Sequence, residues 1–397
     1  MIQFYRMGSC SGATARSNRP EAAIARPPGS FALVERDEAA AIAGEWRSLT
    51  ERAVEDNAFF DPDFALPAMK AIGDGVAIAT WRSEDGRLAA LAPVRPARLG
   101  RIAPAVRIWS HDYGPLGVPL VDRAMTDRAV DGLLDGLMET GGSLVLPDIT
   151  LDGAVAEAIT RHATAAGRGL AVVDSHHRAM LKRPESGDVD CRAALPQRRR
   201  KEYSRQMRRL ADLGAVVVET VSEPDQVKAR FEEFLLLEAA GWKGKRHTAL
   251  AELPPMAAMA REIVGRRAAS GAVRIDSIRL GGQPIAMLLS FLSGATAYSW
   301  KIAYDEAHEK VSPGAQLMLE AGRTLLSNAG IRQIDSCAGA NHPMIDHLWH
   351  DRLAIGTLVI GPAGGGLLHA AGLAAMKAEL RARTVAHGVL RRFGRHG

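Results

Sequence analysis

The residues Ser312, Pro313 and Gly314 lie between an aromatic, strand-like run and an apolar run with helical spacing. Serine is a good helix N-cap, proline suits the first helical turn, and glycine lets another group approach the backbone closely. The free amides of such a turn, together with the positive end of the helix dipole, attract anions. The sequence therefore predicts a phosphate site at this junction. A well-capped helix without any ligand would have the same signature.

The loop GWKGKRH, residues 241–247, combines three cations and one histidine with a tryptophan, and it contains two glycines. Loops of this kind are mobile, and their cations can hold anionic groups. A tryptophan is also a costly residue to leave exposed without a partner. We therefore expect Trp242 and Lys243 to bind substrate or phosphate, against the alternative of a solvated surface loop.

The segment HPMIDHLWH, residues 342–350, holds three histidines. His347 and His350 have the spacing of one helix face, but no HExxH motif accompanies them. The cysteines are too dispersed for a zinc site or a disulfide framework: Cys10, Cys191 and Cys337. We interpret His347 and Trp349 as a wall of the substrate pocket, where His347 could carry a proton near neutral pH.

The stretch PQRRRKEYSRQMRRL, residues 196–210, sets many cations against the single acid Glu202. On a helix most of these cations form one stripe. Four interpretations are open: a solvated linker helix, a site for cofactor phosphates, contact with anionic lipid, or contact with RNA. The place of the stretch between two halves of the chain favours the linker. The basic residues 389–397 keep peripheral membrane contact open, whereas an aromatic content of 5% argues against stacking on bases.

The length of 397 residues suits two domains of about 150–200 residues each. With 47% apolar and 24% charged residues the composition is globular, and the net charge of +5 allows an anionic partner without indicating nucleic acid. Residues 1–30 lack the apolar stretch of a secretion signal, so we expect a disordered tail on a cytoplasmic protein, which could lie at the inner membrane. Residues 353–376 carry no charge, but Pro362 and the glycines at 364–366 predict a strand, a turn and a helix start, not a membrane span.

Two series of elements follow one another in the same order. From 31 to 183 the pattern predicts a helix, a hairpin that turns at Asp85-Gly86, and then strands that alternate with helices. After the basic stretch it predicts a strand, a helix, a hairpin that turns at Gly281-Gly282, a strand over 295–305, the helix after Ser-Pro-Gly and a last strand. This order predicts an α/β or α+β fold with a mixed sheet, duplicated in tandem.

Three segments of the second half carry a family resemblance: LEAAGWKGKRHTAL (237–250), SWKIAYDEAHEKVSPGAQLMLEA (299–321) and IRQIDSCAG (331–339). Through them, residues 196–345 resemble the GNAT-type acyltransferase domain of the CelD-like and BioF2-like proteins, which are related to the Fem-type peptidyltransferases. With the weaker first half, the resemblance implies two tandem GNAT-like units, each a mixed sheet flanked by helices. The expected units are an acceptor-side unit without cofactor over 31–190, an acyltransferase unit over 191–376, and a basic tail over 377–397.

The resemblance also implies acetyl-CoA or another acyl-CoA as cofactor. Its pyrophosphate would bind the amides of the turn over 312–316, and its pantetheine would lie along the strand over 297–304. The family's phosphate loop usually has more glycines than EKVSPGAQ has, so Lys310 is the nearby cation. Fem-type relatives take an aminoacyl group from tRNA, which makes tRNA the alternative donor. The expected cofactor residues are Lys310, Ser312, Pro313, Gly314, Ala315 and Gln316.

Acyl transfer needs a neutral nucleophile, a hydrogen-bond donor for the developing oxyanion, and an acid for the leaving group. The resemblance makes Glu238, before the GWKGKRH loop, and Asp335, at a strand end, the candidate bases. Tyr304, near the end of the cofactor strand, is a candidate acid, and Cys337 lies just past the next strand. Each assignment has a structural alternative: packing on the sheet for Tyr304, a loop cap for Asp335 and a solvated helix position for Glu238.

These inferences predict an acyl-CoA-dependent acyltransferase for an amine or hydroxyl on a small acceptor. A sugar, a lipid or a cell-envelope precursor is the acceptor class that the family suggests. The first half lacks a Ser-Pro-Gly turn in its equivalent region, SHDYGPLGVP (110–119), so we expect this half to have lost cofactor binding and to shape the acceptor pocket. A Fem-type aminoacyl transfer and a non-catalytic partner of polysaccharide synthesis are the alternatives.

Overall fold

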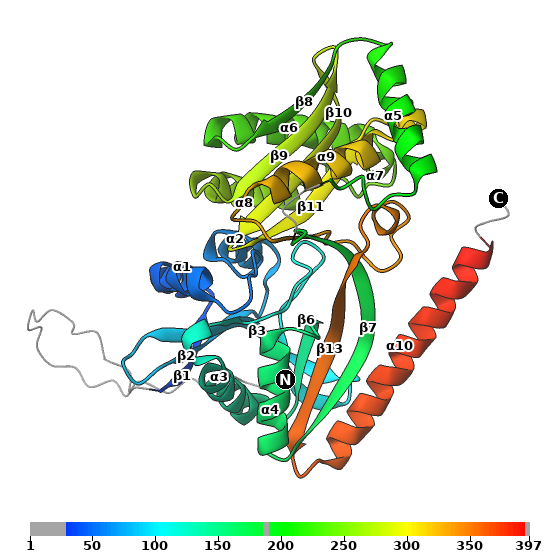
Figure 1. Ribbon diagram of the computed structural model, residues 1–397. Coiled ribbons are helices and arrows are strands. Elements are labelled where there is room, and N and C mark those ends of the chain that lie inside the picture. The colour runs from blue at the N-terminus through cyan, green and yellow to red at the C-terminus, as the bar shows by residue number, and fades with distance from the viewer. Residues whose placement is uncertain (1–28, 186–189, 394–397) are drawn as a thin grey trace, which may run out of the picture.

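The structure is a computed structural model that describes residues 29–185 and 190–393. Its described residues form one mixed sheet of 13 strands, to which both halves of the chain contribute (Figure 1). The strand order is β1-β2-β3-β4-β6-β13-β7-β12-β11-β10-β9-β8, and β5 pairs with β3. Residues 1–28 of the predicted tail lie outside the described residues.

The N-terminal half begins with a strand and ends with the long strand that leads into the other half. Its elements are β1 (Phe31–Glu35), α1 (Ala43–Arg52), α2 (Pro62–Ile72), β2 (Ala77–Arg82), β3 (Leu88–Leu99), β4 (Ala103–Ile108), β5 (Leu120–Val121), α3 (Thr126–Gly141), β6 (Leu144–Thr150), α4 (Ala154–Ala165) and β7 (Arg168–Lys182).

The C-terminal half repeats this order after a basic helix. Its elements are α5 (Gln197–Ala211), β8 (Val216–Val221), α6 (Pro224–Ala240), α7 (Trp242–Lys245), α8 (Pro254–Ala269), β9 (Val273–Leu280), β10 (Gln283–Ser293), β11 (Thr296–Tyr304), the 3-10 helix η4 (Glu306–Val311), α9 (Pro313–Ser327), β12 (Gln333–Asp335), the 3-10 helix η5 (Ile345–His347), β13 (Asp351–Ala363) and α10 (Leu367–Phe393). The predicted tandem arrangement of mixed α/β units is confirmed, and the two sheets are continuous.

The predicted hairpin turns are also confirmed, and glycine explains them. Gly86 has a φ of 79° between β2 and β3, while Gly281 and Gly282 have φ values of 57° and 86° between β9 and β10. These left-handed conformations cost other residues steric strain, and glycine adopts them freely. The turns fix the register in which the hairpins bury one face of the sheet.

Helices cover both faces of the C-terminal half. Phe231 and Phe234 of α6 are buried on one face together with α8, and Leu317 and Leu325 of α9 are buried on the other. Helix α8 also packs against α2 of the N-terminal half, where Arg267 forms a buried ion pair with Asp61 at 2.7 Å. The halves therefore share a packed interface.

The end of the chain returns to the N-terminal half. Strand β13 pairs with β6 on one side and β7 on the other, and α10 packs against Leu99 and Val359 (Figure 1). The predicted unit over 191–376 therefore ends too late, because β13 completes the N-terminal part of the sheet. The predicted tail over 377–397 is helical as far as Phe393. The strand, turn and helix start predicted over 353–376 are confirmed.

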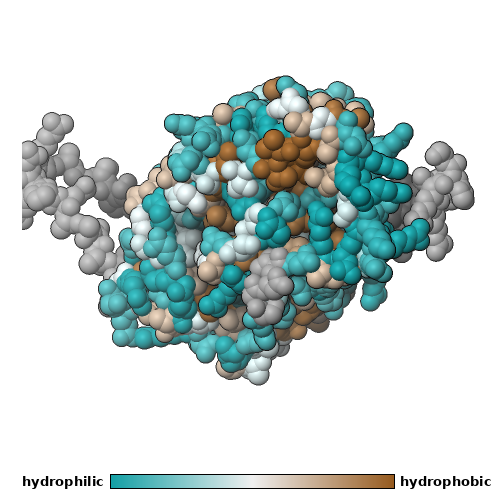
Figure 2. Space-filling model, turned by 45° about the horizontal axis from the view of Figure 1, so that its top comes forward, coloured by the Kyte–Doolittle hydropathy of each residue, from teal (hydrophilic) through white to brown (hydrophobic). Residues whose placement is uncertain are grey.

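The ends of the sheet are β1 and β8, and the surface near β8 is partly apolar. Val217 and Val218 of β8 are exposed, as is Leu213 before it. Figure 2 shows a mainly hydrophilic face that contains one hydrophobic patch. Within the described part of the chain, no helix is both long and apolar enough to cross a membrane.

Candidate active site

The sheet opens between β11 and β12. These parallel strands pair only over the first residues of β11, from Thr296 opposite Gln333 to Tyr298 opposite Asp335. Strand β11 then continues to Tyr304 without a β12 partner. Backbone groups on an unpaired strand edge can bind an extended ligand by hydrogen bonds. The parallel pair β4 and β6 has an even shorter region of pairing, from Val106 to Arg107 of β4.

Beside this opening, Lys301 of β11 lies against Tyr113 in the loop over 110–117. The Lys301 amine lies 4.9 Å from the ring centre of Tyr113 and 5.5 Å from that of Trp300. The indole N–H of Trp300 donates to the Tyr113 carbonyl at 2.7 Å and so fixes the loop on β11. The loop over 110–117, which belongs to the half expected to shape the acceptor pocket, therefore faces the unpaired part of β11.

Burial and charged neighbours lower the pKa of Lys301. Burial, assisted by repulsion from Lys243, lowers the pKa of Lys301 from 10.5 to about 8, while Glu238 and Asp112 oppose the shift. At neutral pH roughly a tenth of an amine with this pKa is uncharged. Lys301 can therefore hold or release a proton near physiological pH.

Glu238 and Lys243 form an ion pair at the edge of the opening. Glu238 is 3% exposed, and its carboxylate accepts from the Lys243 amine at 2.7 Å and from the Leu250 backbone N–H at 2.9 Å. The Lys243 amine also lies 3.4 Å from the carbonyl oxygen of Ile302 in β11. The carboxylate thus anchors the segment over 241–250, which is a structural role that neither sequence alternative included.

Trp242 is 45% exposed and carries Arg246 over its ring at 5.4 Å. It belongs to the short helix α7 and not to an irregular loop. Its ring is partly exposed, and the substrate-binding role of Trp242 stays a prediction.

The first turn of α9 differs from its prediction. Pro313 occupies the first helical position as expected, but Ser312 is left-handed, with φ 49°, and its side chain caps no amide. Residues 313–316 are buried, whereas the prediction had their amides facing outward. A Cβ atom on Gly314 would lie 3.3 Å from Tyr304 and 3.6 Å from the sulfur of Met344.

Two further residues were expected to bind the cofactor: Lys310 is an exposed cation, and Gln316 makes a structural contact. Lys310 is exposed, and its carbonyl accepts from Gln206 of α5 at 3.3 Å. The Gln316 side chain donates to the Tyr203 carbonyl at 2.9 Å, so it holds α5 on α9. Among the described residues, the Gly314 and Ala315 amides have no hydrogen-bond acceptor.

Asp335 lies at the foot of the opening, where it pairs with a cation. Its carboxylate accepts from the buried Arg178 guanidinium and from the Cys337 backbone N–H at 2.9 Å. Burial, together with Asp335, raises the pKa of the Cys337 thiol well above its usual value. The thiol is therefore neutral, and both oxygens of Asp335 have structural partners.

His347 and Trp349, which were expected to form one wall of the substrate pocket, lie in different surroundings. His347 is exposed in η5, whereas Trp349 is 1% exposed in the core against α9. Trp349 is therefore a core residue, and the prediction that it lines the substrate pocket is wrong.

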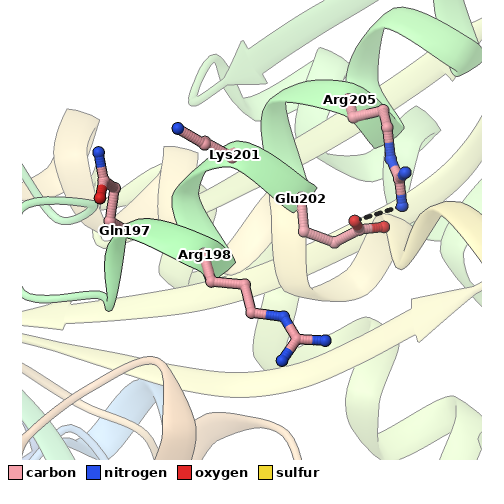
Figure 3. A pocket seen from close by; sticks show the side chains of 5 residues that line it. All are labelled: Gln197, Arg198, Lys201, Glu202 and Arg205. Atoms are coloured by element: carbon pink, nitrogen blue, oxygen red, sulfur yellow. Dashed lines mark hydrogen bonds and ion pairs between the residues drawn. The ribbon is translucent and has the colours of Figure 1, made fainter.

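Helix α5 exposes an almost uniformly basic surface. Tyr203, Gln206 and Leu210 are buried on its inner face. Its exposed cations are Arg198, Arg199, Arg200, Lys201, Arg205, Arg208 and Arg209. Figure 3 shows Arg198 and Lys201 with free ends, while Arg205 pairs with Glu202. Within the described part of the chain, the other cations of α5 have no carboxylate partner.

The sequence of the second half decides the family. Residues 197–342 match the acetyltransferase (GNAT) domain. These residues form a GNAT domain. The match includes the opening between β11 and β12, Lys301 and the first turn of α9, whereas Tyr113 of the site belongs to the N-terminal half. The comparison with curated protein sequences gave no match.

Solved structures share the fold over most of the chain, beyond the GNAT domain itself. The C-terminal domain of a putative lysylphosphatidylglycerol synthetase from Agrobacterium fabrum has a TM-score of 0.53 and 12% identity, covering 86% of this chain and 96% of that one. FemX has a TM-score of 0.53 and 11% identity, covering 80% of this chain and 95% of that one. The arrangement of the GNAT domain with its N-terminal partner unit therefore occurs as a whole in other proteins.

The sequence analysis did not single out Lys301 and Tyr113 of this site. One signal was available, because Lys301 interrupts the aromatic and apolar strand TAYSWKIAY. If a lysine in such a strand faces the protein interior, burial of its amine costs hydration free energy, so the position stands out. Tyr113 had no comparable signal, since its place against β11 depends on the packing of the two halves.

Proposed function

We propose that this protein transfers an acyl group from an acyl-CoA to an amine or hydroxyl of a small acceptor. The observation that carries the proposal is the unpaired part of β11, which lies beside Lys301 and its contact with Tyr113. The acceptor would enter between the halves, along Tyr113 and Trp242, and the acyl donor would lie along β11.

The fit of an acyl-CoA differs between its two ends. The free edge of β11 suits an extended arm, because an unpaired strand offers a row of donors and acceptors. At the other end, the Gly314 and Ala315 amides and the Lys310 side chain suit phosphate, but Tyr304 and Met344 cover this turn. Methionine is flexible, so a change in the Met344 side chain would remove part of the cover over Gly314, while the Tyr304 ring would have to shift for the rest. Acyl-CoA supplies an activated thioester when bound.

The side chains of the site would divide the work of transfer. We keep Tyr304 as the proposed acid, since its ring lies against Gly314 at the end of β11. Glu238 and Asp335 would act as positioning residues, because Lys243 and Arg178 already occupy their carboxylates. His347, which is exposed, remains a proposed contact at the rim.

A sugar, a lipid or a cell-envelope precursor is the acceptor class that we propose. The family supports this class, and the fold shared with a domain of a putative lysylphosphatidylglycerol synthetase is in keeping with a lipid acceptor. A non-catalytic role as a partner in polysaccharide synthesis would leave the free edge of β11 without a use.

Calorimetric titration of the whole protein with CoA and acetyl-CoA tests the proposal. Lys310→Glu is the informative variant, because Lys310 is exposed and its reversal disturbs no packing. We expect binding to wild type that weakens in Lys310→Glu and is unchanged in Lys228→Glu on α6. Gly314→Asp would be ambiguous, since a side chain there meets Tyr304 at 3.3 Å. An absence of binding to folded wild type would overturn the acyl-CoA donor.

The second candidate function is aminoacyl transfer from tRNA, which the basic surface of α5 favours. An exposed stripe of unpaired cations on one helix suits a phosphate backbone. Wild type would then bind tRNA with a steep dependence on salt. Replacing residues 198–201 by alanine should lower the slope of log affinity against log salt by about 3. Alanine at Lys377 and Arg381, which are exposed cations of α10, is the control.

A further inference from the structure

Lys301 lies at an irregularity of β11. In the pairing of β10 with β11, Leu289 lies opposite Lys301 and Ser290 lies opposite Ser299, so Trp300 is an extra residue. Such a bulge bends a strand and re-aims its side chains. The Lys301 amine consequently lies near the rings of both Trp300 and Tyr113. The bulge therefore places the amine where β11 meets Tyr113 of the N-terminal half.

The amine has charged neighbours but no acid of its own. Glu238 lies close by, yet its carboxylate is bonded to Lys243 and to the Leu250 amide. Asp112, in the loop over 110–117, is exposed to solvent. Among the described residues, no carboxylate forms an ion pair with Lys301. A largely buried ammonium without such a partner is costly, and proteins retain such groups at sites of chemistry.

We propose that Lys301 is the proton-carrying catalytic residue of the transfer site. This inference rests on the proposed function and names a residue for it. The uncharged amine takes the proton from the acceptor, whose electron pair then forms the bond to the acyl carbon. The bond between that carbon and the leaving group breaks, and the leaving group departs with its electron pair. Tyr304 gives its proton to the leaving group, and the proton on Lys301 replaces it, so both residues return to their starting state.

The titration of Lys301 supports this assignment. A pKa of about 8 keeps both forms of the amine present near neutral pH. An efficient acid–base residue needs a pKa near the working pH. The opposing influences come from both halves of the chain: Glu238 in α6 and Lys243 in α7, and Asp112 in the loop over 110–117. If Lys301 only packed its aliphatic stem on Trp300, its amine could lie in solvent without any loss of that packing.

The first experiment measures the amine without any substrate. Acetic anhydride labels uncharged amines, so the extent of labelling at each pH, measured by mass spectrometry of the peptide with Lys301, gives its titration. We expect a midpoint at about 8 in the folded protein and at about 10.4 in urea. Lys243→Met removes a like charge and should move the folded midpoint upward. A folded midpoint that equals the midpoint in urea would overturn the proposal.

The second experiment measures transfer with acetyl-CoA as donor and hydroxylamine as a small amine acceptor, with CoA release followed by chromatography. We expect the wild-type rate to rise with pH around 8 and Lys301→Arg to lose about 100-fold in kcat, with KM for acetyl-CoA little changed. The pH-dependent rise should disappear in Lys301→Arg, because arginine stays charged. Lys228→Arg is the matched control and should behave as wild type.

The outcomes distinguish a failure of the Lys301 assignment from a failure of the acyltransferase proposal. A Lys301→Arg variant with the wild-type rate and pH profile would overturn the role of Lys301 while the acyltransferase proposal survives. A wild type that releases no CoA would overturn the acyl-CoA donor, whereas a folded Lys301 midpoint equal to that in urea would overturn the role of Lys301.

Discussion

Arg178 of β7 and Asp335 of β12 form an ion pair that is buried where the two halves of the sheet meet. Arg178 also donates to the Pro115 carbonyl at 2.8 Å, and Asp335 accepts from the Cys337 N–H at 2.9 Å. The pair thus connects the loop that faces Lys301 to the strand that ends at the opening. Its position explains how an N-terminal unit can set the geometry of a site in the C-terminal one.

Asp335→Asn should destabilise the protein strongly, because Arg178 would keep its charge in a buried place without a partner. Breaking a buried pair in this way costs about 3–5 kcal/mol. Urea unfolding followed by tryptophan fluorescence measures the loss. Arg178→Met with Asp335→Asn should recover much of the stability, since no buried charge remains. Unchanged unfolding together with lost acyl transfer would instead restore Asp335 as the candidate base.

The pair Glu238 and Lys243 should behave as an anchor for the segment over 241–250. Glu238→Gln removes the charge that holds Lys243 and weakens the hydrogen bond to the Leu250 amide. We expect a loss of about 2 kcal/mol in the free energy of unfolding, together with faster amide exchange at Leu250. Lys243→Met and the double variant complete a cycle, in which the coupling energy should be about 1–3 kcal/mol. Additive effects would mean that the ion pair does not hold this segment.

Much of the fold follows from local signals in the sequence. The turns at Gly86 and at Gly281-Gly282 need left-handed backbone, and the alternation of apolar residues fixes the strands on either side of them. The GNAT resemblance rested on the segments that now form α6, β11 and α9. These elements are defined by residues close together in the chain, so a single sequence was enough.

The pairing of strands that are far apart in the sequence could not be predicted. Strand β13 is strongly apolar, which predicts burial, but nothing in its residues says that it lies between β6 and β7. The same limit applies to the site. The aromatic signal of Trp349 and the capping signal of Ser312 both indicated function, yet the first side chain lies in the core and the second does not cap. Partners from distant segments decide such roles.

Met344→Ala should open the first turn of α9 to phosphate. The Met344 sulfur lies 3.6 Å from the place of a Cβ on Gly314, so its removal uncovers the turn with its unbonded amides. If acyl-CoA binds there, its affinity should rise by about 3- to 10-fold, because the ligand no longer has to displace a side chain. Isothermal calorimetry with CoA measures the change. Met376→Ala on α10 is the control for a lost methionine, and equal effects of both variants would contradict the prediction.

Lys301→Met should stabilise the protein at neutral pH, and the gain should shrink as the pH rises. In the folded state Lys301 loses its proton at about pH 8, whereas the unfolded chain keeps it until about pH 10.4. Between these values the unfolded chain binds more protons, so the stability of wild type increases with pH. Below pH 8 wild type carries the full cost of a poorly hydrated ammonium, which methionine avoids while it keeps the packing on Trp300 and Tyr113. Thermal unfolding from pH 6 to 10.5 should give an advantage of up to about 3 kcal/mol at low pH that fades toward zero. A constant difference across this range would mean that Lys301 titrates alike in both states, and would leave its place beside Tyr113 without chemical consequence.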